Sequence, residues 1–167
     1  MKYLDPKNDL IFKRVFGENP NITISFLNSL LPLKAGNEIV EIEYLPTELV
    51  PESTMVVKNS IVDVRCKDKH GRQFIVEMQM IWTDSFKSRV LFNASKAYIR
   101  QLYKGSEYKG LQTVYALSIV NEDFELGMEE WYHHYSMIHQ KDPNRRIEGI
   151  QMIFIELPKF NSKNYND

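Results

Sequence analysis

Hydrophobic and polar residues alternate in two short runs, residues 61–66 and 72–79, on either side of Gly71. Both runs are rich in β-branched and aromatic residues, so each of them predicts a strand. The three residues that end at Gly71 suit a type I turn followed by a glycine in the left-handed conformation. The two strands are therefore expected to form an antiparallel hairpin in which Asp63 lies opposite Glu77.

The register of this hairpin separates its two faces. One face is expected to be wholly apolar, and it carries Val62, Val64, Cys66, Phe74, Val76, Met78 and Met80. The other face is mainly polar, and it carries Asp63, Arg65, Lys67, Gln73, Glu77 and Gln79, with Ile61, Ile75 and Ile81 as its apolar members. A two-residue loop would instead shift the register by one position and put the two acids on opposite faces.

Two helices are predicted before the hairpin. Asp5-Pro6 has the character of an N-cap and a first helical residue, and Gly17 is typical of a helix end. Asn19-Pro20 starts the second helix, which ends at Pro32. Apolar residues recur at helical spacing in both segments, so each helix should bury one face.

Further elements are predicted between and after these segments. Residues 38–44 alternate as a strand does, whereas residues 45–59 indicate a loop or a ragged edge. Asp84 is expected to cap a long helix over about residues 85–104. Residues 111–120 form a mostly apolar run that is typical of a buried strand.

The C-terminal region completes the predicted fold. Residues 131–139 and 147–157 are expected to form a second, peripheral strand pair across Asp142-Pro143-Asn144. The overall order, αβββαβ plus this pair, predicts an α/β fold: a mixed sheet flanked by helices, whose last central strand runs parallel to a neighbour after a right-handed crossover. One domain is expected over residues 1–160, with a disordered polar tail at residues 161–167.

Composition narrows the class of protein. With 167 residues and 43% hydrophobic residues, the chain is long and apolar enough for one globular domain. The single cysteine, Cys66, excludes an internal disulfide and is expected to be a small core residue. No apolar run approaches the ~18 residues that span a membrane, and charges interrupt the first residues, so we expect a cytoplasmic protein. Because the net charge is −1, any surface for nucleic acid must be local.

The facing acids Asp63 and Glu77 carry the first chemical hypothesis. Residues directly opposed in a hairpin have Cβ atoms roughly 5 Å apart, and like charges at that separation are destabilising. A hard divalent cation, which prefers oxygen ligands, would compensate them. The alternative is a solvated face on which Arg65 neutralises one of the two acids.

The predicted long helix carries five cations and no acid: Lys87, Arg89, Lys96, Arg100 and Lys104. The last four are separated by seven, four and four residues, so they lie along one stripe of the helix. Such a stripe repels itself, and the phosphates of DNA would relieve the repulsion. We therefore predict that these four residues bind DNA, the alternative being an ordinary solvated face.

Other kinds of site find less support. A zinc site at His133, His134 and His139 is disfavoured, because neighbouring residues of a strand point to opposite faces. The serines lack a matching pattern of histidine and acid, and no glycine-rich phosphate loop is present.

Four blocks of the sequence resemble those of a known family, the PD-(D/E)XK nuclease family transposases, also called recombination-promoting nucleases. The blocks are Asn8–Gly17, Asp63–Arg65, Phe74–Gln79 and Ile155–Phe160, in this order. Each block is short, but together they cover nearly the whole chain. The resemblance implies a restriction-endonuclease-like core and a DNA endonuclease that depends on Mg²⁺ or Mn²⁺ and is associated with transposition or recombination.

The resemblance also implies roles for single residues. Asp63 corresponds to the first acid of the family motif and Glu77 to the second, and both would bind the metal, with the Met78 carbonyl as a third ligand. Gln79 occupies the position of the superfamily lysine and would position the attacking water. Asp9 matches the acid often carried by the first helix and would bind a second metal or its waters, although its place in a first helical turn explains it equally well.

The sequence departs from the superfamily pattern at two positions. Val62 stands where proline is usual. Gln79 replaces lysine, as the resemblance implies for this family generally, and its side chain cannot carry a positive charge. That charge would have to come from elsewhere, and Lys87 or Lys96 are the candidates. The alternative function is therefore a nuclease-fold module that binds DNA or a protein partner without cutting.

Two expectations concern the assembly and the extent of the chain. DNA is the expected partner, and a homodimer is a possible assembly. Members of the family usually continue into a helical C-terminal region, so the chain is expected to be a truncated or a short member.

Overall fold

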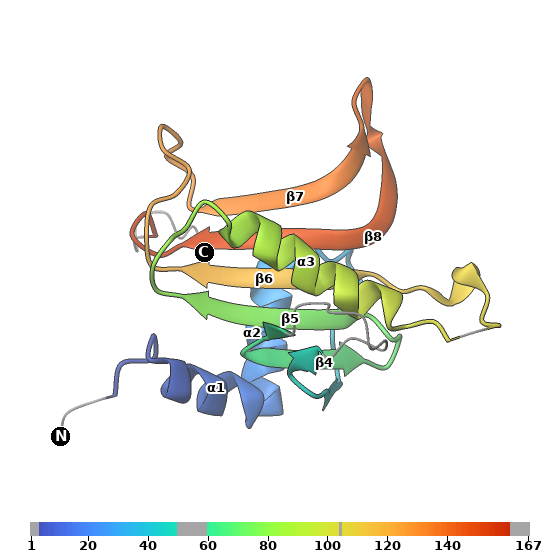
Figure 1. Ribbon diagram of the computed structural model, residues 1–167, viewed down its shortest axis with the longest axis horizontal. Helices are drawn as coiled ribbons and strands as arrows, with labels where there is room; N and C mark the ends of the chain where they lie inside the picture. The colour runs from blue at the N-terminus through green and yellow to red at the C-terminus, as the bar shows by residue number, and fades with distance from the viewer. Residues whose placement is uncertain (1–3, 50–59, 104, 161–167) are drawn as a thin grey trace.

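The computed structural model describes residues 4–49, 60–103 and 105–160. Its main strands are β1 Ile42–Tyr44, β4 Val64–Asp68, β5 Gln73–Gln79, β6 Val114–Val120, β7 Tyr132–His139 and β8 Asp142–Glu156. They form one six-stranded sheet in the order β1-β4-β5-β6-β8-β7 (Figure 1). A separate antiparallel ribbon pairs β2 Glu48–Leu49 with β3 Ser60–Ile61.

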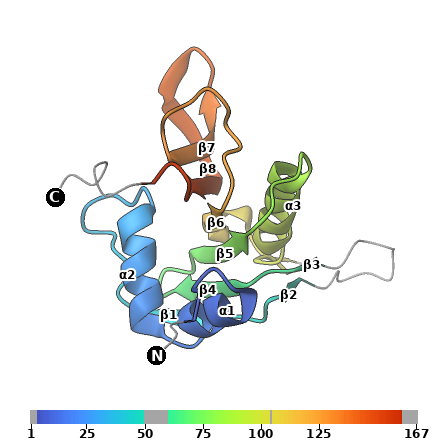
Figure 2. The ribbon, with the colours of Figure 1, turned by 90° about the vertical axis from the view of Figure 1, so that its left-hand side faces the viewer.

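Helices cover both faces of the sheet (Figure 2). They are α1 Asp9–Gly17, α2 Pro20–Leu30 and α3 Phe86–Ile99, with a short 3-10 turn, η1, at Tyr108–Gly110. Phe12 of α1 and Leu27 of α2 belong to the buried cluster that contains Val64 and Phe74. The opposite cluster joins the apolar stripe of α3 to Ile75. The predicted α/β class, a mixed sheet between helices, is therefore confirmed.

Helix α1 begins later than the sequence pattern predicted. Its N-cap is Asn8, whose side-chain oxygen accepts two backbone N–H groups of the first turn at 3.1 and 3.4 Å. Asp5 instead accepts the backbone N–H of Lys7 at 2.9 Å in the preceding turn. The shift puts Asp9 at the first helical position, where a negative charge interacts favourably with the helix dipole. The start of α2 at Pro20 agrees with the prediction.

The register of the central hairpin is as predicted. β4 and β5 are antiparallel, with Val64 opposite Val76 and Lys67 opposite Gln73. Gly71 ends the three-residue loop with a φ of 80°, which only glycine adopts readily. If this register is continued by one residue, Asp63 lies opposite Glu77, as the sequence predicted.

Val62 does not share the apolar face of Val64, contrary to the prediction. The chain bends at Asp63, and the Val62 N–H donates to the Thr47 carbonyl at 3.1 Å, beside the ribbon of β2 and β3. The Val62 side chain joins the buried cluster of Ile75 and α3. The alternation failed here because β4 starts only at Val64, so the bend separates the two valines.

The second face of the hairpin is buried rather than solvated. Helix α3 lies across it, and the side chains of Arg65, Gln73 and Glu77 belong to residues that are only 7, 8 and 7% exposed. Arg65 Nη2 donates to Gln73 Oε1 at 2.8 Å, so polar groups on this face bind one another. Buried polar groups need such partners, and Glu77 has one in Asn93 of α3.

The predicted peripheral strand pair is part of the main sheet, which corrects the sequence interpretation. β6 is parallel to both β5 and β8, and β7 pairs with β8 at the edge. The parallel strand after the long helix was predicted correctly. β8 starts at Asp142, so the turn lies at residues 140–141 and Pro143 falls inside the strand. Proline is tolerated there because this part of β8 has β7 as its only neighbour in the sheet.

The predicted strand 38–44 is reduced to β1. Ile39, which the alternation assigned to the strand, is held by Asn28 of α2 instead. Asn28 Nδ2 donates to the Ile39 carbonyl, and the Ile39 N–H donates to Asn28 Oδ1, both at 2.8 Å. An amide side chain thus takes the place of a neighbouring strand.

Other boundaries also differ from the predictions. The helix predicted over residues 85–104 ends at Ile99. The predicted loop 45–59 contains β2, and its residues 50–59 lie outside the described residues, as does the tail 161–167. Among the described residues, no helix has the length and apolar character that crossing a membrane requires.

The end of β8 is held by a fully buried carboxylate, Glu156. Its Oε1 accepts the backbone N–H groups of Phe124 at 2.5 Å and Glu125 at 2.9 Å, and its Oε2 contacts His133 Nε2 at 2.9 Å and Lys159 Nζ at 2.5 Å. Burial alone would raise the pKa of Glu156, but hydrogen bonds, first of all from Lys159, lower it to about 2. The carboxylate joins the loop before β7, β7 itself and the turn after β8.

We predict that Glu156 makes stability depend on acid. A carboxyl whose pKa falls from 4.5 to about 2 on folding stabilises the protein above the unfolded pKa, and this stabilisation is lost as the pH falls towards the folded one. Glu156→Gln should lower the free energy of unfolding at neutral pH by about 2 kcal/mol, since charge-assisted hydrogen bonds are lost. It should also weaken the pH dependence between 4.5 and 2 in urea unfolding experiments.

The matched control is Glu129→Gln, which changes an exposed acid. It should leave both the stability at neutral pH and the acid dependence close to those of the parent. An acid dependence that is identical in Glu156→Gln and in the parent would contradict the assigned role.

Candidate active site

Asp63 and Glu77 meet where the pairing of β4 with β5 stops. Asp63 Oδ2 accepts the backbone N–H of Met78 at 2.8 Å, so a side chain replaces the next bond of the ladder. The N–H and C=O groups of one strand residue point to the same side, and the Met78 carbonyl therefore faces the same edge. Two carboxylates and one carbonyl from neighbouring residues are brought together at this point.

Glu77 is the buried member of the pair. Its Oε1 accepts a hydrogen bond from Asn93 Nδ2 at 3.1 Å, and its Oε2 lies 4.0 Å from Arg89 Nη2, both on α3. Burial raises the pKa of Glu77, and the charge of Asp63 raises it further, whereas Asn93 and Arg89 act in the opposite direction. The negative charge of Glu77 is thus only partly compensated by the protein.

Asp63 is compensated by a residue that the sequence analysis missed. Lys13 Nζ lies 3.3 Å from Asp63 Oδ1 and 2.8 Å from Asp9 Oδ1. The hydrogen bond to Asp9 is the main cause that raises the pKa of Lys13; burial opposes it, and Asp63 adds to it. Asp9 therefore reaches Asp63 only through Lys13. The spacing of four residues between Asp9 and Lys13 is visible in the sequence, but the contact of Lys13 with Asp63 depends on how α1 packs.

Gln79, the residue predicted to position water, lies two residues beyond Glu77 on β5. Its Oε1 accepts a hydrogen bond from Arg89 Nη2 at 2.5 Å, and its Nε2 donates to the carbonyl of Ile81. Arg89 is thus placed between the side chains of Glu77 and Gln79. The sequence analysis assigned neither Asn93 nor Arg89 to the acid pair; it predicted Arg89 as a DNA-binding residue.

The two lysines proposed to supply the missing positive charge are engaged elsewhere. Lys87 lies at the N-terminal end of α3, where its Nζ forms an ion pair with Glu125 and donates to Tyr135 Oη of β7. Lys96 Nζ donates to the Leu49 carbonyl at 3.2 Å and to Ser60 Oγ at 2.9 Å. The cation that the structure places at Asp63 is Lys13.

The cations predicted to bind DNA do not share one exposed surface. Lys96 is 7% exposed, and burial, then the charge of Arg100, lowers its pKa. Arg89 faces Glu77, Arg100 is half-buried after the last turn of α3, and Lys104 lies outside the described residues. The spacing predicted that these cations share one stripe of the helix, but it could not predict whether that stripe faces solvent or the rest of the protein. Contact of these residues with DNA stays a prediction.

The residues at this point fit a hard divalent cation. Mg²⁺ is usually bound through one or two carboxylates, with waters completing its shell, and Asp63, Glu77 and the Met78 carbonyl offer oxygens of this kind. Asn93 Oδ1 is buried and has no hydrogen-bond partner within the described residues, so it can accept from a water beside Glu77. In the described part of the chain, three or more histidine, cysteine or acidic side chains do not gather around one point.

Comparison with known proteins decides the family. A family model described as PD-(D/E)XK nuclease family transposase matches residues 6–167. The chain belongs to this family. No curated protein and no solved structure matches it. Membership confirms the resemblance seen in the sequence and the restriction-endonuclease-like fold, and it relates the chain to nucleases of transposition. Nucleases of this family type generally use divalent metals.

We predict that the two acids affect the metal-free protein differently. Glu77→Gln removes a buried charge and keeps an oxygen for Asn93, so it should raise the melting temperature in EDTA at neutral pH. Because the folded pKa of Glu77 is raised, the parent gains stability as the pH falls, and the advantage of the variant should disappear in acid. Asp63→Asn loses the ion pair with Lys13 and should bring no such gain.

Melting curves in EDTA from mildly alkaline to acidic pH test this difference. A clear loss of stability in Glu77→Gln at neutral pH would show that Glu77 is a structural residue, and would argue against a metal site.

Proposed function

We propose that this member of the PD-(D/E)XK family is a Mg²⁺- or Mn²⁺-dependent DNA endonuclease that acts in transposition or recombination. The observation that carries the proposal is the meeting of Asp63, Glu77 and the Met78 carbonyl where β4 separates from β5. A purely structural pair of acids would be expected to have balanced partners, whereas Glu77 is buried with a raised pKa. A cation bound between them would remove this imbalance.

Asp63, Glu77 and the Met78 carbonyl would hold the ion in this proposal. A bound Mg²⁺ supplies a water of lowered pKa and positive charge at the attacked phosphate. Gln79 can orient such a water through its amide, while Asn93 offers a second acceptor beside Glu77. These two side chains approach from β5 and from α3, so they can hold a water between the sheet and the helix.

We further propose that Lys13 supplies the positive charge that Gln79 lacks. Its ammonium is held by Asp9 at 2.8 Å, and this contact can keep it near the site when Asp63 turns to a cation. The freed charge would then stabilise the phosphate, which is negative and becomes more so during attack by water. Asp9 would act as a positioning residue through Lys13, rather than as a metal ligand.

The second candidate is a nuclease fold that binds DNA without cutting it. Gln79 favours it, because an amide cannot replace the charge of lysine. In that case the DNA contacts predicted for Arg89, Lys96, Arg100 and Lys104 would be the whole function. A chain that binds DNA equally in Mg²⁺ and in EDTA, and leaves it intact, would support this candidate. Action in the cytoplasm and assembly into a homodimer stay predictions.

We predict that Asp63→Asn and Glu77→Gln each lower the nicking of supercoiled plasmid by roughly a hundredfold or more, the scale expected when electrostatic stabilisation is removed. Parent protein should nick plasmid in Mg²⁺ or Mn²⁺ and not in EDTA. Glu43→Gln, which changes an exposed acid on β1, is the control and should keep full activity. Plasmid left intact by the parent at every metal concentration would reject the nuclease proposal.

We predict that Lys13→Gln slows nicking without weakening metal binding. Lys13 competes with a cation for Asp63, so its loss should leave the rise of the melting temperature with Mg²⁺ unchanged or larger. Its charge would be absent from the phosphate, so the nicking rate should fall by about tenfold to a hundredfold, and Lys13→Arg should recover part of it.

Arg14→Gln, an exposed neighbour on the same helix, is the matched control and should behave like the parent. If Lys13→Gln weakens metal binding and nicking together, Lys13 only keeps Asp63 in place.

A further inference from the structure

The β7–β8 hairpin extends beyond the rest of the sheet. β8 pairs with β6 only from Ile150 onwards, so the eight residues before it have β7 as their only strand neighbour. The ribbon carries register shifts after Ser136 and after Ile138, and such bulges increase its twist. In Figures 1 and 2 its end stands away from the helices. Residues 137–147 are called the hairpin arm below.

The base of the arm is braced against α3. Gly149 of β8 has such close neighbours that an added Cβ would lie 3.5 Å from Met137 Cε and 3.7 Å from the Tyr98 ring. Tyr98 is packed against the same buried cluster as Tyr135 and Ile150. The arm is therefore supported where it leaves the body, while its outer part is open to solvent.

The outer part of the arm combines cations with exposed apolar side chains. It carries Lys141, Arg145 and Arg146 against a single acid, Asp142, which gives a formal charge of +2 on a chain whose net charge is −1. Asp142 is paired with Arg145 at 3.0 Å, but Lys141 and Arg146 have no ion pair with any described residue. The arm thus carries two cations without an ion pair to a described residue, although Glu148, just beyond the arm, lines a second hollow together with Arg146.

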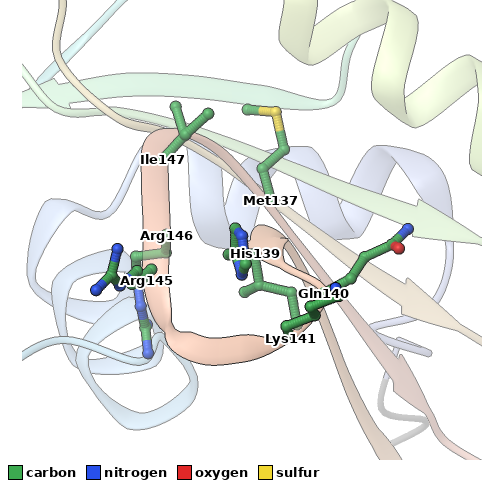
Figure 3. Close-up of a pocket in the computed structure, with 8 residues that line it drawn as sticks. Met137, His139, Gln140, Lys141, Arg145, Arg146 and Ile147 are labelled. Atoms are coloured by element: carbon green, nitrogen blue, oxygen red, sulfur yellow. The ribbon is translucent and has the colours of Figure 1, made fainter.

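A hollow of about 680 Å³ is lined by residues of both strands of the arm and of its turn (Figure 3). Met137 and Ile147 are paired across the ribbon and point to the same side of it, and they are 48 and 69% exposed. Arg145 and Arg146, both from β8, also line this hollow. The arm therefore offers an apolar side bordered by guanidinium groups.

We propose that the hairpin arm grips the backbone of duplex DNA. This inference rests on the proposed nuclease function. A two-stranded ribbon fits the major groove of DNA, which is about 12 Å wide, and arginine and lysine at its tip can reach the phosphates on both sides. The exposed Met137 and Ile147 can contact sugars and thymine methyl groups. A protein partner of ordinary composition would leave the unpaired charges of Lys141 and Arg146 without their complement.

The arm lies far from the candidate site along the strands. The pairing of β5 with β6 and of β6 with β8 puts Glu77 level with Phe154. Arg146 precedes Phe154 by eight residues, which span about 26 Å along an extended strand at about 3.3 Å per residue. The arm therefore holds DNA without taking part in the cleavage chemistry. Loss of its charges should weaken binding and leave the cleavage step unchanged.

The test compares two double variants that remove the same charge. Lys141→Gln with Arg146→Gln changes the arm, and Lys69→Gln with Lys109→Gln changes two exposed lysines outside it. Affinity for a duplex of about two turns is measured in EDTA by fluorescence anisotropy over a series of salt concentrations. Each phosphate contact adds about 0.9 to the slope of log affinity against log salt, so the arm variant should lose up to about 1.8.

The remaining measurements separate the outcomes. With saturating DNA and Mg²⁺, the single-turnover nicking rate of the arm variant should match that of the parent. If the salt slope changes equally in both double variants, or in neither, the proposed DNA contact of the arm is overturned. The nuclease proposal is still supported in that case if the parent protein nicks plasmid. If the arm variant has a different sedimentation coefficient from the parent but the same salt slope, the arm is a contact between copies of the chain. That result also overturns the proposed DNA contact. A parent that neither binds nor nicks DNA rejects both proposals.

Discussion

The hydrogen bond from the Met78 N–H to the Asp63 carboxylate is the contact on which the candidate site depends. It ends the pairing of β4 with β5, because a side chain occupies the donor that the next backbone carbonyl would have taken. The chain then bends, and Val62 pairs with Thr47 instead of continuing the hairpin. β5 nevertheless runs on to Gln79, so Glu77 extends past the end of its partner strand. A site with two acids and a carbonyl arises because β5 continues for three residues, 77–79, beyond its last pair with β4.

Because this point lies in the sheet, helices reach it from both faces. Lys13 comes from α1 on one side, and Asn93 and Arg89 come from α3 on the other. The compensation is unequal: Asp63 has a cation at 3.3 Å, whereas among the described residues the nearest cation to Glu77 is at 4.0 Å, and burial raises the pKa of Glu77. Binding of a cation would require the ionised form of Glu77, so metal affinity should increase with pH in the range where Glu77 loses its proton.

The parts of this arrangement that the sequence predicted are those controlled by local geometry. The loop at Gly71 and the alternation around it determine the register of the hairpin, and through it the approach of Asp63 to Glu77. What the sequence could not supply depends on packing over long distances. Periodicity placed Lys96 on a stripe with Arg100, but the burial of Lys96 depends on the ribbon of β2 and β3 beside α3. The C-terminal strands were judged peripheral because pairing between distant strands leaves no local pattern.

Gln79 illustrates how a departure from the superfamily pattern can be consistent with its surroundings. Its Oε1 accepts a hydrogen bond from Arg89, and a lysine at this position could offer no acceptor and would place a second cation against the guanidinium. Arg89 and a lysine at position 79 are therefore poorly compatible, whereas Arg89 and glutamine are complementary donor and acceptor. In this chain the positive charges at the acid pair come from helices α1 and α3, and β5 contributes a neutral side chain between them. Glutamine at position 79 is thus compatible with cations that come from the helices, and it is not by itself a sign of a lost function.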